Sequence, residues 1–81
     1  MSGEDAFGHK VDIMYTKHLS NAGHTRKFEI TDLGGTWEVR TVEDSRLVKQ
    51  VRYDDWHRVE RAMLTIRLEV STLEAAGWVA D

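Results

Sequence analysis

The side chains best suited to chemistry are four histidines, and no cysteine accompanies them. His18 and His24 are six positions apart with a predicted turn between them, and His57 stands further along the chain. Zinc sites on a helix use two histidines four residues apart, and many zinc sites also use cysteine. No histidine pair in this sequence has that spacing, so the sequence predicts no metal and no cofactor.

Asp54 and Asp55 beside His57 form the second candidate, because a carboxylate next to an imidazole is common in acid/base catalysis. Such catalysis needs a pocket that tunes the acidity of its groups, and the sequence indicates none. Helix capping accounts for both aspartates, since either carboxylate can accept hydrogen bonds from the first helical amides. We therefore predict no catalytic residues and a protein that is not an enzyme.

Glycine pairs and small polar residues mark the predicted turns. Gly34-Gly35 lies between two alternating runs and lacks the longer pattern of a phosphate-binding loop. Glycine adopts positive φ at little cost, which a two-residue hairpin requires. Asp44-Ser45 and the cluster from Ser20 to Gly23 predict two further turns.

These turns separate four runs with the alternation of β-strands. Strands are predicted over residues 11–16, 26–33, 36–43 and 46–53, and a helix over 55–76. Because short connections make neighbouring strands antiparallel, the fold class is α+β. We predict an antiparallel meander of three to four strands, with the first strand's membership open, and one long C-terminal helix packed on one sheet face. Residues 1–10 are predicted to be a flexible tail ahead of a single domain over 11–81.

Alternation also assigns side chains to the two sheet faces. In the first strand, Val11, Ile13 and Tyr15 are predicted together on the inner face. In the last strand, Leu47 and Lys49 are predicted on the inner face and Val48 on the outer face. A lysine on the inner face indicates either that its stem snorkels to solvent or that the strand is irregular there.

One apolar stripe runs along the predicted helix at the spacing of a single helix face. Its members are Trp56, Val59, Met63, Ile66, Val70 and Leu73. Gly77 predicts the end of the helix, because a left-handed cap favours glycine. Trp78 can then fold back onto Leu73, as in a Schellman motif.

Leu64 and Leu68 lie outside this stripe, about 100° to 140° around the helix from Met63. Two interpretations remain open: the helix's own sheet covers a wide apolar face, or this second ridge contacts another subunit. A helix of about 33 Å is longer than the roughly 15 to 20 Å width of a four-stranded sheet. We therefore expect the helix to overhang its own sheet and to expose an apolar patch of Val70, Leu73 and Trp78.

The second interpretation predicts a homodimer built on the helix. Its interface would contain Leu64, Leu68 and Trp78, flanked by Glu60, Arg67 and Glu74 at intervals of seven residues. A twofold axis would bring the same ridge of each copy together. Ion pairs at the flank would set the register, since an exposed pair contributes at most about 1 kcal/mol.

The composition bears on partners and location. The formal net charge is −3, whereas nucleic-acid-binding domains usually carry a basic surplus. No apolar run approaches the roughly 20 residues that span a bilayer, and the polar first ten residues lack the apolar core of a signal peptide. The absence of cysteine is compatible with a reducing cytosol. We expect a cytoplasmic protein with no membrane partner.

Four basic residues on or near the outward sheet face keep a nucleic-acid alternative open: Lys27, Arg40, Arg46 and Arg52. The order of four strands and a helix over residues 11–78 resembles the Whirly-type and coactivator-type single-stranded DNA binders, which also dimerise through helices. That resemblance covers topology alone and implies binding of single-stranded nucleic acid. No aromatic residue is predicted on the same face, whereas single-strand binders combine a basic groove with stacking aromatics.

The function predicted first is a small non-enzymatic binding or regulatory module. It would act through protein–protein contacts, as an inhibitor or accessory factor for a partner that the sequence does not name. The missing catalytic group, the mixed charges of the sheet and the surplus apolar helix surface favour this prediction. Binding of single-stranded nucleic acid is the alternative.

Overall fold

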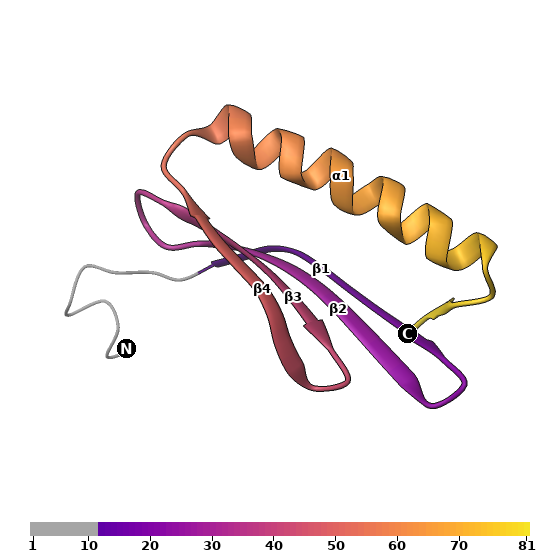
Figure 1. Cartoon of the computed structure of the whole chain (residues 1–81). Coiled ribbons are helices and arrows are strands. Elements are labelled where there is room, and N and C mark those ends of the chain that lie inside the picture. Colours follow the sequence, from indigo (N-terminus) through magenta and orange to yellow (C-terminus); the bar gives the residue numbers. More distant parts are fainter. Residues whose placement is uncertain (1–11) are drawn as a thin grey trace.

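Five strands and one helix make up residues 12–81, the part of the chain that the computed structural model describes. The elements are β1 (Asp12–Asn21), β2 (His24–Asp32), β3 (Trp37–Glu43), β4 (Arg46–Tyr53), α1 (Trp56–Ala75) and β5 (Val79–Ala80). All pairings are antiparallel, in the order β4-β3-β2-β1-β5, and α1 lies over one sheet face (Figure 1). The predicted α+β meander with a C-terminal helix is confirmed; the tail predicted over residues 1–10 and the face predicted for Val11 lie outside the described residues.

The first predicted strand joins the sheet and is longer than expected. β1 pairs with β2 along its length and extends to Asn21 rather than ending at residue 16. The turn contains only Ala22 and Gly23, both with positive φ, so β2 starts at His24 instead of residue 26. Leu19 is fully buried in the core, and the pairing with β2 continues past it to Asn21 and His24.

The other two hairpin turns lie at their predicted positions, and both contain positive φ angles. Gly34 and Gly35 have φ of 85° and 143°. Asp44 and Ser45 have φ of 52° and 66°, the signature of a two-residue turn between twisted strands. The Asp44 carboxylate also accepts a hydrogen bond of 2.8 Å from the Thr25 amide, which ties this turn to β2.

A β-bulge in β1 changes the predicted face of Ile13. The β1–β2 register shifts between Ile13 and Tyr15, so Met14 is the extra residue. Ile13 pairs with Thr31 on the face away from α1 and is 61% exposed. The prediction that Ile13 and Tyr15 share the inner face is therefore wrong, because one extra residue inverts the alternation beyond it.

A second bulge lies in β4, where the inward lysine indicated an irregular strand. The register with β3 shifts so that Leu47 pairs with Val42, on the outer face, while Lys49 pairs with inward Thr41. Val48 and Lys49 both line a cleft on the helix side of the sheet. The predicted faces of Leu47 and Val48 are thus both wrong, and that of Lys49 is confirmed.

The core lies between α1 and the inner face of the sheet. Its buried members are Leu19, Phe28, Ile30, Val39, Val59, Ile66 and Val70. The three helical members belong to the predicted stripe, and Met63 and Leu73 are half-buried beside them. The expected exposed patch of Val70, Leu73 and Trp78 is therefore wrong, because Val70 is buried and Leu73 and Trp78 are half-buried against the core. Trp56, at the start of the stripe, is 37% exposed and packs its ring 5.4 Å from that of Trp37.

Both ends of α1 are capped as predicted. Asp55 accepts a hydrogen bond of 2.9 Å from the His57 amide. Gly77 has φ of 104°, and the Trp78 amide donates to the Leu73 carbonyl at 3.0 Å, which completes a Schellman motif. Within residues 12–81, no helix combines the length and apolar character that crossing a membrane requires.

β5 is an element that the sequence did not predict. After Gly77 the chain returns to the sheet, where Val79 pairs with Ser20 and Ala80 with Leu19. The Asp81 amide adds a hydrogen bond of 2.9 Å to the His18 carbonyl. The helix consequently starts at the β4 side of the sheet and ends at the β1 side, so it crosses the strands diagonally (Figure 1).

Candidate functional site

The clearest unpartnered surface is the ridge formed by Leu64 and Leu68 on α1. Their side chains are 60% and 71% exposed, whereas Ile66 between them is buried in the core. A residue two positions away on a helix points almost to the opposite side, about 200° around. The ridge therefore faces away from the sheet, and the interpretation in which the sheet covers both leucines is wrong.

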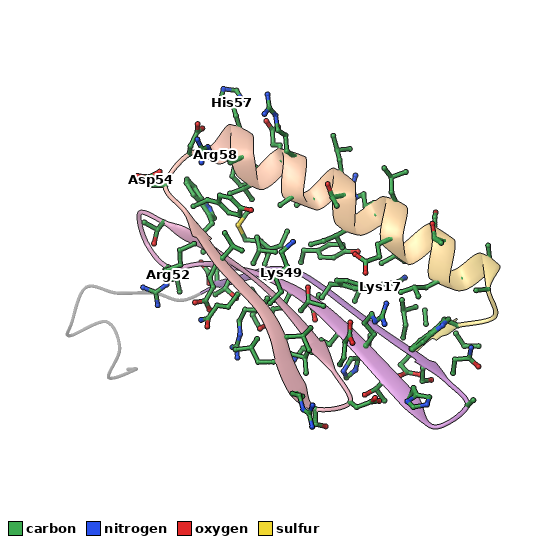
Figure 2. All side chains as sticks on the ribbon, viewed as in Figure 1. Lys17, Lys49, Arg52, Asp54, His57 and Arg58 are labelled. Atoms are coloured by element: carbon green, nitrogen blue, oxygen red, sulfur yellow. The ribbon has the colours of Figure 1, made fainter. Side chains whose placement is uncertain are left out.

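Polar side chains and a hollow accompany this ridge. A hollow of about 490 Å³ lies beside Leu64, with Glu60 and Arg67 among its walls. His57 contacts Glu60, with 3.4 Å between Nδ1 and Oε1. In Figure 2 the His57 side chain projects from the helix away from the sheet. An apolar ridge with opposite charges at its side has the composition of a small protein-binding surface.

The other two predicted interface residues are engaged by the chain's own sheet. Trp78 is half-buried against the core, with the Arg26 guanidinium 5.2 Å from its ring centroid. Glu74 faces Lys17 of β1 across 3.9 Å. The exposed ridge is thus narrower than predicted and centres on Leu64 and Leu68, with Glu60 and Arg67 beside them.

A larger cleft, of about 700 Å³, lies between α1 and the β3–β4 hairpin. Val39 and Ile66 give it an apolar floor, and Thr41, Tyr53 and Thr65 add hydroxyl groups. Its charged residues are Glu43, Lys49, Arg58, Arg61 and Glu69. Figure 2 shows Lys49 in the space between sheet and helix, and Arg58 at the start of α1.

Arg26 holds both carboxylates of this cleft. It reaches Glu43 of β3 at 3.3 Å and Glu69 of α1 at 3.6 Å. Its own side chain is 22% exposed and covers Trp78. One arginine therefore joins β2, β3, the helix and the C-terminal segment.

The basic residues predicted for nucleic-acid contacts do not form one free strip. Lys27 pairs with Glu29 at 3.6 Å, and Arg52 with Glu38 at 3.3 Å. Arg40 lies between them in the outer face, half-buried. Arg46 lies at the hairpin end on the inner face, where it is the cross-strand neighbour of Glu43. Neighbouring carboxylates neutralise most of this surface, which weakens its attraction for phosphates.

Glu38 is the most buried carboxylate of the outer face, with its side chain 10% exposed. The pKa of Glu38 lies below its ordinary value of 4.5. The largest cause is a hydrogen bond from the side-chain amide of Gln50, and the hydrogen bond and charge of Arg52 add to it, whereas burial acts in the opposite direction. A lowered folded-state pKa means that the ionised form stabilises the fold. That contribution is complete above pH 4.5 and is lost as the pH falls through the folded-state pKa.

We expect Glu38→Gln to lower the free energy of unfolding by about 1–3 kcal/mol at pH 7, because charge-assisted hydrogen bonds are lost. The difference from the wild type should shrink on acidification below pH 4.5. Urea denaturation at several pH values measures both. Asp54→Asn, at an exposed position, removes the same charge and should leave the acid dependence unchanged. A difference that stays constant from pH 7 downward would contradict this assignment.

The residues considered for acid/base chemistry, Asp54, Asp55 and His57, lie at exposed positions at the start of α1. Asp55 caps the helix through the His57 amide, and His57 is 86% exposed. His24 pairs with Asp44 at 3.1 Å. The hydrogen bond from the Thr25 amide, and after it the contact with His24, lower the pKa of Asp44. Among residues 12–81, no three His, Asp or Glu side chains come together in a way that could hold a metal ion.

Comparison with known proteins finds no match among family models, curated proteins or solved structures. Two surfaces of α1, the ridge and the cleft, are the candidate binding sites. Sequence reasoning identified the ridge and missed the cleft with Lys49, Arg58 and Arg61. The one sequence feature that could have indicated the cleft was the lysine, Lys49, at an inward strand position.

Proposed function

We propose that this chain is a small non-enzymatic protein-binding module, and that the α1 ridge binds a second copy of the chain. The observation that carries the proposal is the exposure of Leu64 and Leu68 on the side of α1 opposite the core. A cytoplasmic role as an inhibitor or accessory factor agrees with this small, cysteine-free chain.

A second copy suits the ridge because the ridge complements itself. In an antiparallel pair of helices with the twofold axis near Ile66, Leu64 of each copy meets Leu68 of the other. Glu60 and Arg67 are two helix turns apart on one flank. With the axis at residue 66, Glu60 of one copy lies level with Thr72 of the other, about 7.5 Å along the helix from the opposite Arg67. These charged side chains therefore flank the leucines without fixing the register.

The expected affinity is modest. Full burial of a leucine is worth about 1.5–3 kcal/mol, and Leu64 and Leu68 already have part of their surface covered. Association costs about 4–15 kcal/mol in lost freedom. At these exposures each leucine is worth about 1–2 kcal/mol, so the four leucines of a dimer exceed the cost of association only at its lower limit. This predicts a weak dimer.

Sedimentation equilibrium tests this proposal. We expect the average mass of the wild type to rise measurably above the monomer mass by about 100 μM, a concentration at which a weak dimer is already populated. Leu64→Glu with Leu68→Glu should give a folded monomer, because two buried charges per chain would face each other across the axis. Far-UV circular dichroism establishes that the variant remains folded.

Thr16→Glu with Leu47→Glu is the matched control, since it adds the same charges at exposed positions of the sheet. It should keep the dimer. A wild-type monomer at about 100 μM would contradict self-association. Dissociation of both variants alike would show that added charge, rather than loss of the ridge, separates the copies.

A further inference from the structure

The cleft between α1 and the β3–β4 hairpin carries charges that the fold leaves unbalanced. Its three cations are Lys49 from β4 and Arg58 and Arg61 from α1. The two carboxylates in its walls, Glu43 and Glu69, are both held by Arg26. Arg26 comes from β2 and is not part of the cleft wall.

No salt bridge within residues 12–81 involves Lys49, Arg58 or Arg61. Three like charges around one cleft repel one another, and low-dielectric walls strengthen the field between them. Nothing in the packing of the core requires them, because their side chains lie at exposed positions. An anion in the cleft would remove this repulsion.

We propose that this cleft binds a small ligand that carries phosphoryl or carboxylate oxyanions. Arginine presents a planar fork of donors that matches both groups, and lysine adds a point charge. The cleft volume of about 700 Å³ suits a small molecule. The hydroxyl groups of Thr41, Tyr53 and Thr65 can hydrogen-bond to it, and Val39 and Ile66 offer apolar contact.

The cleft is separate from the ridge proposed for self-association. Leu64 and Leu68 do not line it, and Arg61 alone reaches both the cleft and the hollow beside the ridge. Ligand binding in the cleft therefore does not depend on the proposed dimer. Failure of either proposal leaves the other intact.

Titration of the ¹⁵N-labelled full chain by NMR tests this inference, with pyrophosphate and citrate as separate probes at constant ionic strength. We expect at least one probe to give saturable shifts of amides around Lys49, Arg58 and Arg61. The probe that binds more tightly tells a phosphoryl ligand from a carboxylate ligand. Lys49→Gln with Arg58→Gln should weaken that binding about tenfold or more, the effect of losing charge-assisted contacts worth about 1.4 kcal/mol together.

Lys27→Gln with Arg52→Gln is the matched control, because it removes one lysine and one arginine from the outer sheet face, on the side away from the cleft. It should change the affinity by less than about twofold, as expected for distant exposed charges at constant salt. Absence of saturable shifts with both probes would overturn the proposal. So would equal weakening in the two variants, or binding of a single-stranded oligonucleotide when neither small anion binds.

Discussion

Leu19→Ala is expected to lower the free energy of unfolding by about 2–5 kcal/mol, the usual cost of truncating a buried leucine and leaving a cavity. Leu19 is fully buried and lies in β1 beside β5. A chain of 81 residues has little stability to spare, since domains near this size rarely exceed about 3–5 kcal/mol. We therefore expect a substantial unfolded fraction at 37 °C, measurable by thermal and urea denaturation.

Leu68→Ala deletes the same atoms at a position that is 71% exposed. In the monomer it should change stability by no more than about 0.5 kcal/mol, as for other surface substitutions. If the ridge self-associates, the loss of stability caused by Leu68→Ala should grow with protein concentration, because binding between folded copies stabilises the wild type by mass action. Equal losses for Leu19→Ala and Leu68→Ala in dilute solution would contradict the assignment of core and ridge.

The features that the sequence predicts correctly depend on neighbours along the chain. The helix stripe, the Asp55 cap and the Gly77 termination follow from local spacing and backbone preference. The separation of Leu64 and Leu68 from that stripe is also a local property of helix geometry. Whether the sheet covers both leucines was left open by the sequence, and only the structure shows that they are exposed.

The features that the sequence does not predict depend on pairing between distant segments. The bulges at Met14 and Val48 are defined by the partner strand, and each reverses the faces of neighbouring residues. β5 has only two residues, too few to show alternation. The anionic-ligand cleft requires Lys49 and Arg58 to approach from different elements, which residue spacing does not show.

Arg26→Met is expected to lower the free energy of unfolding by about 1–3 kcal/mol, because a cation–π contact and two partly exposed ion pairs are lost together. The ion pairs join Arg26 to Glu43 and Glu69, and the π contact is to Trp78. Methionine keeps much of the apolar stem, so the change removes mainly the charge. The buried Nε of Arg26 has no hydrogen-bond partner in the structure, and removing it offsets part of the loss.

Urea denaturation measures this effect, and Arg26→Lys is the matched control. Lysine keeps the positive charge but lacks the planar fork that spans two carboxylates and lies flat on an indole. Its stability should fall between those of the wild type and Arg26→Met. An Arg26→Met protein within about 0.5 kcal/mol of the wild type, the range of ordinary surface changes, would contradict the role assigned to this residue.

Arg26→Met should also weaken anion binding, although Arg26 does not line the cleft. Its loss frees Glu43 and Glu69, which are then able to pair with the cations that share the cleft with them. Internal carboxylates compete with an external oxyanion for the same donors, so the affinity for the binding probe should fall in Arg26→Met. Arg26→Met with Glu43→Gln and Glu69→Gln removes these competitors and should restore it. If the affinity of Arg26→Met equals that of the wild type while the protein remains folded, Arg26 does not set the charge of the cleft.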